Sequence, residues 1–467
     1  KSFTPYEAKM TMTGGVISNG IAGKLDAEGN YLSGGQAGNV MIYASRASTS
    51  YTIDEVETTV AETFAATFTM TGGTITGGKA NNAGNIDVYG VMTMDGGLIS
   101  DGFALNEGAN VRVYYIKDID ADGNEFAVSS FTMNDGEITG GYATKNGGNL
   151  LTYGITNLNT GKITGGEAAN MGGNLRPFRP TVLTIGENYT ISGGTSNTGS
   201  GGNIAMGGTS TESYSSYCTV TIQGTVINGS APNSLGDNIY ASSDYTILTI
   251  DGATITGGAD TDLYFDGNSK LTLKGNTTIG KLHLTNDSKQ DVNATDLTST
   301  TPISLICDKA GAFASATTDK TACFTNDMGR EITFVDGKLH IGNANIVYVS
   351  NDGKDTNAGT EAAPFKTINH ALDMVKDHGT VNIVSVADVD AFKMHNKHVT
   401  LTGGELNITN ASRIELMDHI HFKNMTLTMP DGEKVPVTHW ENVIGRSKSS
   451  DIQIQDPLLT RMSLSAI

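Results

Sequence analysis

Short stretches of alternating apolar and polar residues recur along the first 285 positions of the chain. Leu248-Thr249-Ile250 shows the pattern, with an apolar residue on either side of a threonine. Alternation with a period of two is typical of a β-strand that has one buried face. Paired glycines separate one stretch from the next, as in Met70-Thr71-Gly72-Gly73-Thr74-Ile75. The pattern therefore predicts many short strands joined by tight turns.

This strand-turn-strand element repeats along the chain. Where no insertion intervenes, its first apolar residues follow one another at intervals of 23 to 28 positions. They are Met70, Met94, Met133, Leu158, Ile185, Ile222, Ile250 and Leu273, with a weaker copy at Met12. An interval of this size predicts one coil of a solenoid, made of three short strands. A helical solenoid has a similar period, but paired glycines and β-branched inward residues argue against helices.

A second marker, an asparagine next to a glycine, closes each coil. Its copies are Gly38-Asn39-Val40, Gly84-Asn85-Ile86, Gly148-Asn149-Leu150, Gly173-Asn174-Leu175, Gly202-Asn203-Ile204 and Asp237-Asn238-Ile239, and Asn110 fills the same place after Ala109. Neighbouring coils of a parallel stack lie about 4.8 Å apart, so these amides can hydrogen-bond to one another in a ladder. We expect the ladder to be structural; the alternative is a ligand site made of amides.

The repeat and its asparagine marker resemble those of the pectin-lyase-like superfamily, in particular the repeat-rich surface proteins of bacteria. The resemblance covers residues 10 to 285. It implies an all-β chain folded as a right-handed parallel β-helix solenoid with three strands per coil. It says little about activity, because this fold carries lyases, hydrolases, phage spikes and adhesins alike.

The repeat fades after Leu284, and other elements follow. We expect a β-rich cap or linker over 286–344, because an open coil end would expose strand edges and core side chains. The strand that begins at Ile346, an Asp/Asn/Gly loop and a short helix through Val375 resemble the opening of another pectin-lyase-like module. The expected regions are therefore the β-helix over 1–285, the cap, and a second β-helix module with one helix, short or truncated, over 345–467.

Composition and charge limit the classes of partner that the chain is expected to bind. Glycine makes up 58 of 467 residues, about 12% against a usual 7%, without the three-residue period of collagen. The net charge of −19 disfavours nucleic acid, anionic membranes and polyuronates as partners. No run approaches the roughly 18 apolar residues of a membrane span, so direct membrane insertion is not expected. With neither a signal peptide at Lys1 nor a sorting motif at Ile467, we expect a mature protein or a segment of a longer one.

Three cysteines are too few for a disulfide framework in a chain of this length. Cys307 and Cys323 are close enough in sequence to close one loop. The alternative is that these two and Cys218 are small buried thiols.

Extra residues fall repeatedly after the asparagine strand, at 45–67, 115–130, 176–181 and 207–219. Insertions at one corner of a solenoid project from one side, which is often its binding face. Their aromatic and arginine side chains suit sugar rings or a protein ligand. The predicted ligand-binding residues are Arg46, Tyr115, Arg176, Phe178, Arg179, Tyr214 and Tyr217. The alternative is that these side chains only cover the edges of the coils.

One insertion carries alternating carboxylates that resemble the start of a calcium loop. They are Asp118, Asp120 and Asp122, followed by a turning glycine. The match is partial, because Ser129 stands where an EF-hand has its bidentate glutamate. Calcium is thus the candidate cofactor, against the alternative of a solvated acidic loop.

Seven of the nine histidines lie in the 345–467 region, among them His395 and His398. Strand alternation would place His419 and His421 on one face, at a spacing suited to zinc. No cysteine or acidic partner stands at a defined spacing from them, so exposed or core histidines are the preferred interpretation.

Enzymes of this fold usually cluster carboxylates in a groove along one sheet. The outward strand positions here are mainly Thr, Ser, Asn and Gly, and no paired carboxylates can be assembled on adjacent coils. We therefore expect a non-enzymatic bacterial protein, extracellular on the cell surface or secreted, that acts as an adhesin or stalk and displays loops for a glycan or a partner protein. The alternatives are a polysaccharide lyase or glycoside hydrolase, and a structural fibre or spike that self-associates along the solenoid axis.

Overall fold

The computed structural model describes residues 8–437, apart from 44, 54–55, 65, 120–124, 128, 208–216, 243–244, 287–289, 393–396 and 411–419, and two short strands near the C-terminus. Side chains at 44–65 and 117–128 are outside this description. The chain divides into two compact units, Lys1–His283 with Asp287–Ile303, and Leu284–Asn286 with Ser304–Ile467. The three regions expected from the sequence stay a prediction, because a division by compactness does not identify a cap.

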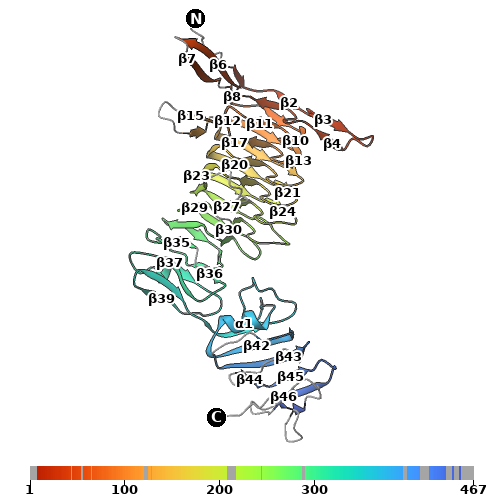
Figure 1. The fold of residues 1–467 in the computed structure, drawn as a ribbon, viewed down its shortest axis with the longest axis vertical. Coiled ribbons are helices and arrows are strands. Elements are labelled where there is room, and N and C mark those ends of the chain that lie inside the picture. Colours follow the sequence, from red (N-terminus) through yellow and green to blue (C-terminus); the bar gives the residue numbers. More distant parts are fainter. Residues whose placement is uncertain are drawn as a thin grey trace. The chain divides into compact units, whose positions relative to one another are not determined.

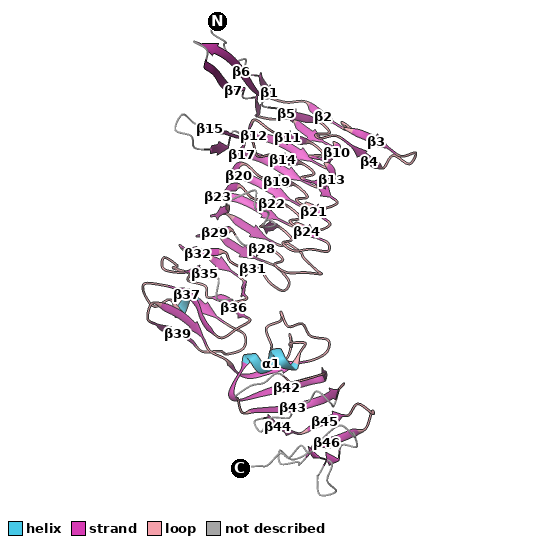
Figure 2. Cartoon of the chain, in the orientation of Figure 1, coloured by secondary structure: helices cyan, strands magenta, loops and turns pink. Residues whose placement is uncertain are grey.

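Strands of the first unit that lie one repeat apart pair side by side, and their stacks form three parallel sheets (Figures 1 and 2). In this unit the first sheet holds β1 (Ala8–Met12), β2 (Val16–Ser18), β8 (Ala66–Met70), β9 (Thr74–Thr76), β12 (Val91–Ser100), β17 (Ser130–Thr139), β20 (Ile155–Thr164), β23 (Thr181–Ser192), β26 (Cys218–Ile222), β27 (Thr225–Ile227), β29 (Thr246–Asp251), β30 (Thr254–Thr256), β32 (Lys270–Lys274), β33 (Thr278–Ile279) and β35 (Asp291–Asn293). The second holds β10 (Lys79–Asn82), β13 (Phe103–Glu107), β18 (Tyr142–Ala143), β21 (Glu167–Ala168) and β24 (Thr195–Ser196). The third holds β5 (Val40–Ile42), β11 (Ile86–Val88), β14 (Val111–Val113), β19 (Leu150–Thr152), β22 (Leu175–Pro177), β25 (Ile204–Met206), β28 (Ile239–Ser242), β31 (Leu263–Asp266) and β34 (Lys281–Leu284). The chain is thus almost entirely β, with long stacks of parallel strands, as a solenoid requires.

The register of the first sheet keeps the apolar residues of successive repeats in line. Met94 lies opposite Met133, and Met133 opposite Leu158. All three are fully buried. A slip of one residue would turn the whole inward set to the other face, so burial of one face fixes this register.

The last glycine of the strand turn lies close to a methionine of the preceding repeat. A Cβ on Gly136, whose φ is +111°, would lie 2.6 Å from Cε of Met94. Gly97 stands in the same relation to Met70, also at 2.6 Å. Each such Cβ would also lie 2.8 Å from a backbone carbonyl of the preceding repeat, so this contact and the positive φ require glycine here.

Antiparallel hairpins occupy two of the expected insertions. One joins β6 (Ser45–Ile53) to β7 (Val56–Phe64), and the other joins β15 (Lys117–Ile119) to β16 (Glu125–Ala127). Both lie between a strand of the third sheet and the next strand of the first sheet, which confirms the predicted common corner. A third hairpin pairs β3 (Gly23–Leu25) with β4 (Tyr31–Gly34), between the first and third sheets.

The second unit begins with short strands and continues as a sheet beside one α-helix (Figure 1). Its elements are β36 (Ile303–Cys307), β37 (Gly311–Ser315), the 3-10 helix Thr321–Cys323, β38 (Phe324–Thr325), β39 (Ile332–Val335), β40 (Lys338–Ile341), β41 (Ala344–Val349), α1 (Ile368–Met374), β42 (Val375–Val389), β43 (Val399–Ile408), β44 (Ile420–Lys423), β45 (Met425–Thr428), β46 (Lys434–Val437), β47 (Ile444–Gly445) and β48 (Ile452–Gln453). Strands β41, β42, β43 and β45 pair in parallel in that order. The Thr367 hydroxyl caps α1 by accepting a hydrogen bond from the His370 amide. An apolar cluster that includes Val347, Leu372 and Leu401 forms the core of this sheet and helix.

The three cysteines are free and buried, so Cys307 and Cys323 form no disulfide. Burial raises the pKa of the Cys218 thiol to about 11 and that of the Cys307 thiol to about 12. Both thiols are therefore protonated and unreactive in the folded chain near neutral pH. Among the described residues, no helix has the length and apolar character needed to cross a membrane.

Candidate functional site

The asparagines that close the repeats form a continuous hydrogen-bonded ladder. In each step Nδ2 of one asparagine donates to Oδ1 of the next residue at 2.6–2.7 Å. The ladder runs through Asn39, Asn85, Asn110, Asn149, Asn174, Asn203 and Asn238 and ends on the carboxylate of Asp262. The predicted ladder is confirmed.

Each amide inside the ladder uses its full hydrogen-bonding capacity. Nδ2 of Asn149 also donates to the Thr164 carbonyl at 2.9 Å, and its Oδ1 also accepts from the Gly141 amide at 2.9 Å. An amide has two donor and two acceptor positions, and all four are occupied. Because these groups are fully buried, the ladder has a structural role and offers nothing to a ligand.

An aromatic residue follows each of five ladder asparagines, four positions further along the chain. We call this set the aromatic row: Tyr43, Tyr89, Tyr114, Tyr153 and Phe178. Neighbouring rings have centroids 4.9 to 5.8 Å apart and tilt toward one another. Each residue directly follows a strand of the third sheet, so the row lies at the corner from which the insertions depart.

The aromatic row is partly open to solvent. Tyr43 is 60% exposed and Tyr114 is 40% exposed, whereas Tyr89, Tyr153 and Phe178 are half-buried. Aromatic rings in such a row cover one another and leave edges and part of their faces accessible.

A buried ion pair lies beneath the row. The Arg112 guanidinium donates to both carboxylate oxygens of Asp87, at 3.0 Å from Nε and 2.6 Å from Nη2. Nη2 also donates to the Tyr89 hydroxyl at 2.9 Å, and the guanidinium carbon lies 5.1 Å from the Tyr114 ring centroid. Burial lowers the pKa of Arg112, but the hydrogen bonds and charge of Asp87 outweigh this, and the net shift is upward. Arg112 therefore stays charged and holds two rings of the row in place.

A second arginine lies under the end of the row. Arg176 is buried, and its guanidinium carbon lies 5.2 Å from the Phe178 ring centroid. Nη1 donates to the Ala205 carbonyl at 2.7 Å. Burial lowers the pKa of this guanidinium. Nearby, the Tyr153 hydroxyl donates to Oε2 of Glu107, and burial together with that carboxylate raises the pKa of Tyr153.

The predicted ligand-binding residues fall into three groups. Phe178 belongs to the aromatic row, Tyr115 is half-buried beside it, and Tyr217 is exposed and packs its ring against Tyr245. Arg176 and Arg179 are buried, with the Arg179 guanidinium 4.7 Å from the Tyr245 ring centroid, so a ligand would meet the rings before the arginines. The Arg46 side chain and Tyr214 lie outside the described residues. Ligand binding by this set stays a prediction.

Four residues of the aromatic row were not predicted from the sequence, because the predicted ligand-binding residues all lie inside the insertions. Tyr43, Tyr89, Tyr114 and Tyr153 precede the insertions or occur where none follows. Their signal was the constant distance from the ladder asparagine. That distance is enough to place them at one corner of successive coils.

The predicted metal ligands lie mostly outside the described residues. Asp120, Asp122 and His419 are not described, and Asp118 belongs to β15, whose side chains are not described either. His421 lies on β44 opposite Thr400. Calcium binding therefore stays a prediction.

The chain was compared with models of protein families, with curated proteins and with solved structures, and none of them matches it.

Proposed function

We propose that this chain is a right-handed parallel β-helix protein with three strands per coil that binds a glycan along its aromatic row. It would serve as an extracellular adhesin or stalk of a bacterial surface. The observation that carries the proposal is the row itself, with five aromatic residues in register on successive repeats. A glycan chain is also a linear repeat, so it can engage several rings at once.

The chemistry of the row suits sugar rings. Aromatic faces pack against the apolar C–H faces of a sugar, and tyrosine hydroxyls supply donors and acceptors for its hydroxyl groups. Arg112 orders two of the rings from below, so little side-chain entropy is lost when a ligand binds. A preformed, partly apolar surface with a few polar groups is typical of ligand sites.

The carboxylates next to the row favour binding over catalysis. Asp87 is buried against Arg112, and Glu107 accepts from Tyr153 and from Nδ2 of Asn146. A glycosidase needs two carboxyl groups that face the scissile bond across a gap. Since these two acids hold neighbouring side chains, they support a scaffold and not an acid–base pair.

The proposal is tested with a glycan array followed by titration of the bound glycan, using the wild-type chain and the double variant Tyr43→Ala/Tyr114→Ala. Each ring contact is worth about 1 kcal/mol, so the double variant should lose about 2 kcal/mol, or roughly 30-fold, in affinity. The matched control is Tyr142→Ala, since Tyr142 is also exposed but lies on the second sheet.

The same glycans are then assayed for new reducing ends and unsaturated products. Binding without turnover, weakened in the double variant alone, supports the proposal. Turnover that is lost on replacing one carboxylate would show a carbohydrate-active enzyme instead. The proposal would also be wrong if the chain bound a partner protein and no glycan.

A further inference from the structure

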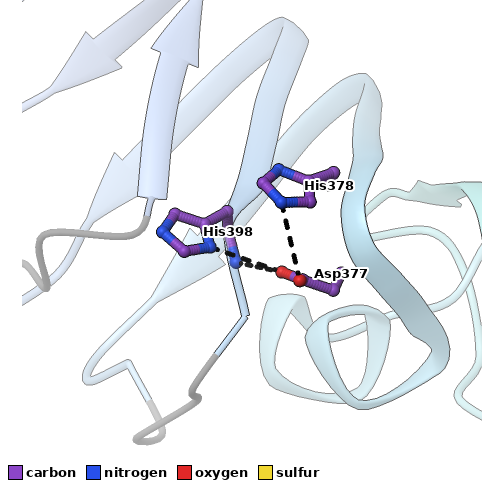
Figure 3. Close-up of side chains that lie close together, drawn as sticks. All are labelled: Asp377, His378 and His398. Atoms are coloured by element: carbon purple, nitrogen blue, oxygen red, sulfur yellow. Dashed lines mark hydrogen bonds and ion pairs between the residues drawn. The ribbon is translucent and has the colours of Figure 1, made fainter. Parts of the chain in front are cut away.

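Three metal-ligating side chains meet in the second unit, where α1 ends and the sheet begins. Figure 3 shows the Asp377 carboxylate beside the imidazoles of His378 and His398, with a contact to each. Asp377 and His378 belong to the start of β42, and His398 directly precedes β43. All three residues are exposed, and their possible ligand atoms lie within 4.8 Å of one another.

The spacing of these atoms fits one metal ion. Nε2 of His378 is 3.6 Å from Oδ2 of Asp377, and Nδ1 of His398 is 3.5 Å from Oδ1. Ligands held about 2.0–2.2 Å from a tetrahedral zinc ion lie roughly 3.3–3.6 Å from each other. Each imidazole nitrogen thus stands at about this distance from one oxygen of the carboxylate, His378 from Oδ2 and His398 from Oδ1, and a small rotation of the exposed side chains brings the three ligands onto one ion.

The backbone holds the three residues in this arrangement. The His378 amide donates to the His398 carbonyl at 2.7 Å, and the His398 amide donates to Oδ1 of Asp377 at 2.7 Å. Parallel pairing of β42 with β43 continues directly from Gly379 and Val399. A group of ligands on paired strands needs little reorganisation to bind.

Two further features fix the turn that carries Asp377 and His378. His378 has a φ of +59°, a conformation that is uncommon for a residue with a side chain and that frequently marks a functional position. Lys397, next to His398, donates from Nζ to the carbonyls of Leu372, Asp373 and Val375 at 2.7–3.0 Å and so ties this segment to the end of α1.

The charges of the cluster suit a cation. The cluster offers one carboxylate and two imidazole nitrogens as possible ligand atoms. The two rings are stacked 4.9 Å apart and nearly parallel, with Nε2 of His378 and Nδ1 of His398 both directed at the carboxylate (Figure 3). Their side chains are 75% and 45% exposed, so the rings can turn to converge on an ion.

We infer that Asp377, His378 and His398 form a binding site for a zinc ion, with water as the fourth ligand. Two imidazoles and one carboxylate prefer zinc and similar transition metals over calcium, which takes oxygen ligands only. The ion links the start of β42 to the start of β43, and its binding stabilises the folded second unit by mass action. This site is independent of the proposed glycan surface.

The test is a titration of the metal-free full chain with Zn²⁺ in competition with a chromophoric chelator. The variants are His378→Gln and His398→Gln, and the control is His340→Gln on β40 of the same unit. Wild type and control should bind one ion with equal affinity. Removal of an outer-shell partner typically weakens metal affinity 10- to 100-fold. Each site variant lacks a direct ligand, so its affinity for Zn²⁺ should fall by at least that factor.

Two readouts distinguish this site from adventitious binding. Co²⁺ in place of zinc should give the visible absorption of a four-coordinate ion in wild type and control but not in the variants. Zn²⁺ should raise the melting temperature of wild type and leave that of the variants unchanged. An absence of Zn²⁺ binding, affinity that both variants retain, or equal competition by Ca²⁺ would each overturn the inference. Circular dichroism without metal establishes that all four proteins fold.

Discussion

A buried amide stabilises a fold only when its donors and acceptors are all paired, and the interior asparagines of the ladder meet this condition. Asn149 has four partners, which are Asn110, Asn174, Thr164 and Gly141. An unpaired buried group costs about 1–3 kcal/mol. Replacing Asn149 with alanine removes one hydrogen bond from each of these four buried groups and interrupts the ladder, so we expect a loss of about 3 kcal/mol or more in the free energy of unfolding, measured by urea denaturation.

The control for this prediction is Asn159→Ala in the next repeat. Asn159 is exposed and donates one hydrogen bond, to Asn134 at 2.8 Å. A surface change of this kind should alter the free energy of unfolding by no more than about 0.5 kcal/mol. If the two alanine variants were equally stable, the ladder would have no structural role.

The last residue of the ladder must be an acceptor on both sides. Oδ1 of Asp262 accepts from Asn238 at 2.7 Å and from Gly258 at 2.8 Å, and Oδ2 accepts from the Lys281 amide at 2.9 Å. In Asp262→Asn the side-chain amide would direct two N–H groups at the Lys281 N–H. We expect a loss of about 1–3 kcal/mol in the free energy of unfolding.

The reverse substitution, Asn238→Asp, provides the comparison. It would place a carboxylate oxygen opposite Oδ1 of Asp262 and remove the donor that joins them. Burial already raises the pKa of Asp262, and a second carboxyl at this distance would raise it further. Both variants should be less stable than wild type in the same urea titration. Stabilisation by Asp262→Asn would contradict the explanation.

At the level of strands, the middle residues of the third-sheet strands show how a polar pair fits into a stack that also holds apolar residues. Asp87 lies opposite Arg112, and Arg112 lies opposite Leu151, so leucine already fits one repeat further along. Arg112→Leu should cost about 3–5 kcal/mol in the free energy of unfolding, because Asp87 remains buried without its partner. The double variant Asp87→Leu/Arg112→Leu should recover most of this loss.

A double-mutant cycle that includes Asp87→Leu measures the coupling energy directly. If the double variant proved as unstable as Arg112→Leu alone, the cost would come from packing and not from the unpaired charge. The double variant also separates stability from binding. It should recover stability, but it still lacks Arg112, which orders Tyr89 and Tyr114 in the aromatic row.

The strands and the ladder were predictable from the sequence because both arise from local repeats. Alternation identifies the strands, and the anchors predict which residues stack, as Met94 on Met133 confirms. The aromatic row could have been found in the same way, from its fixed distance to the ladder. To predict the ion pair of Asp87 and Arg112, one must know which residues of two neighbouring coils lie opposite each other. The sequence gives this register only after the repeats are aligned.

The cluster of Asp377, His378 and His398 could not be predicted from spacing. His378 and His398 are brought together by the pairing of β42 with β43, in a region without a repeat. The left-handed turn at His378 has no sequence signal, since glycine is the usual residue there and Gly379 follows it. Strand alternation instead indicated His419 and His421 as possible zinc ligands, and of these two only His421 is described.

At the scale of the whole chain, the repeats of the first unit and the region 344–437 of the second are packed in different ways. In the first, each repeat packs on its neighbours in the stack, so stability accumulates along the chain. In the second, one apolar cluster includes residues from Ala344 to Val437. Compact units of one chain generally unfold as separate cooperative blocks. We therefore expect two transitions in differential scanning calorimetry.

Matched core substitutions assign the two transitions. Ile163→Ala in the first unit and Leu401→Ala in the second each remove a fully buried aliphatic side chain, at an expected cost of about 2–5 kcal/mol. Each should lower the temperature of one transition and leave the other in place. Zn²⁺ should raise only the transition that Leu401→Ala lowers, because Asp377, His378 and His398 lie in the same unit as Leu401. A single transition lowered by both substitutions would mean that the units unfold together, and the chain would then be one cooperative body.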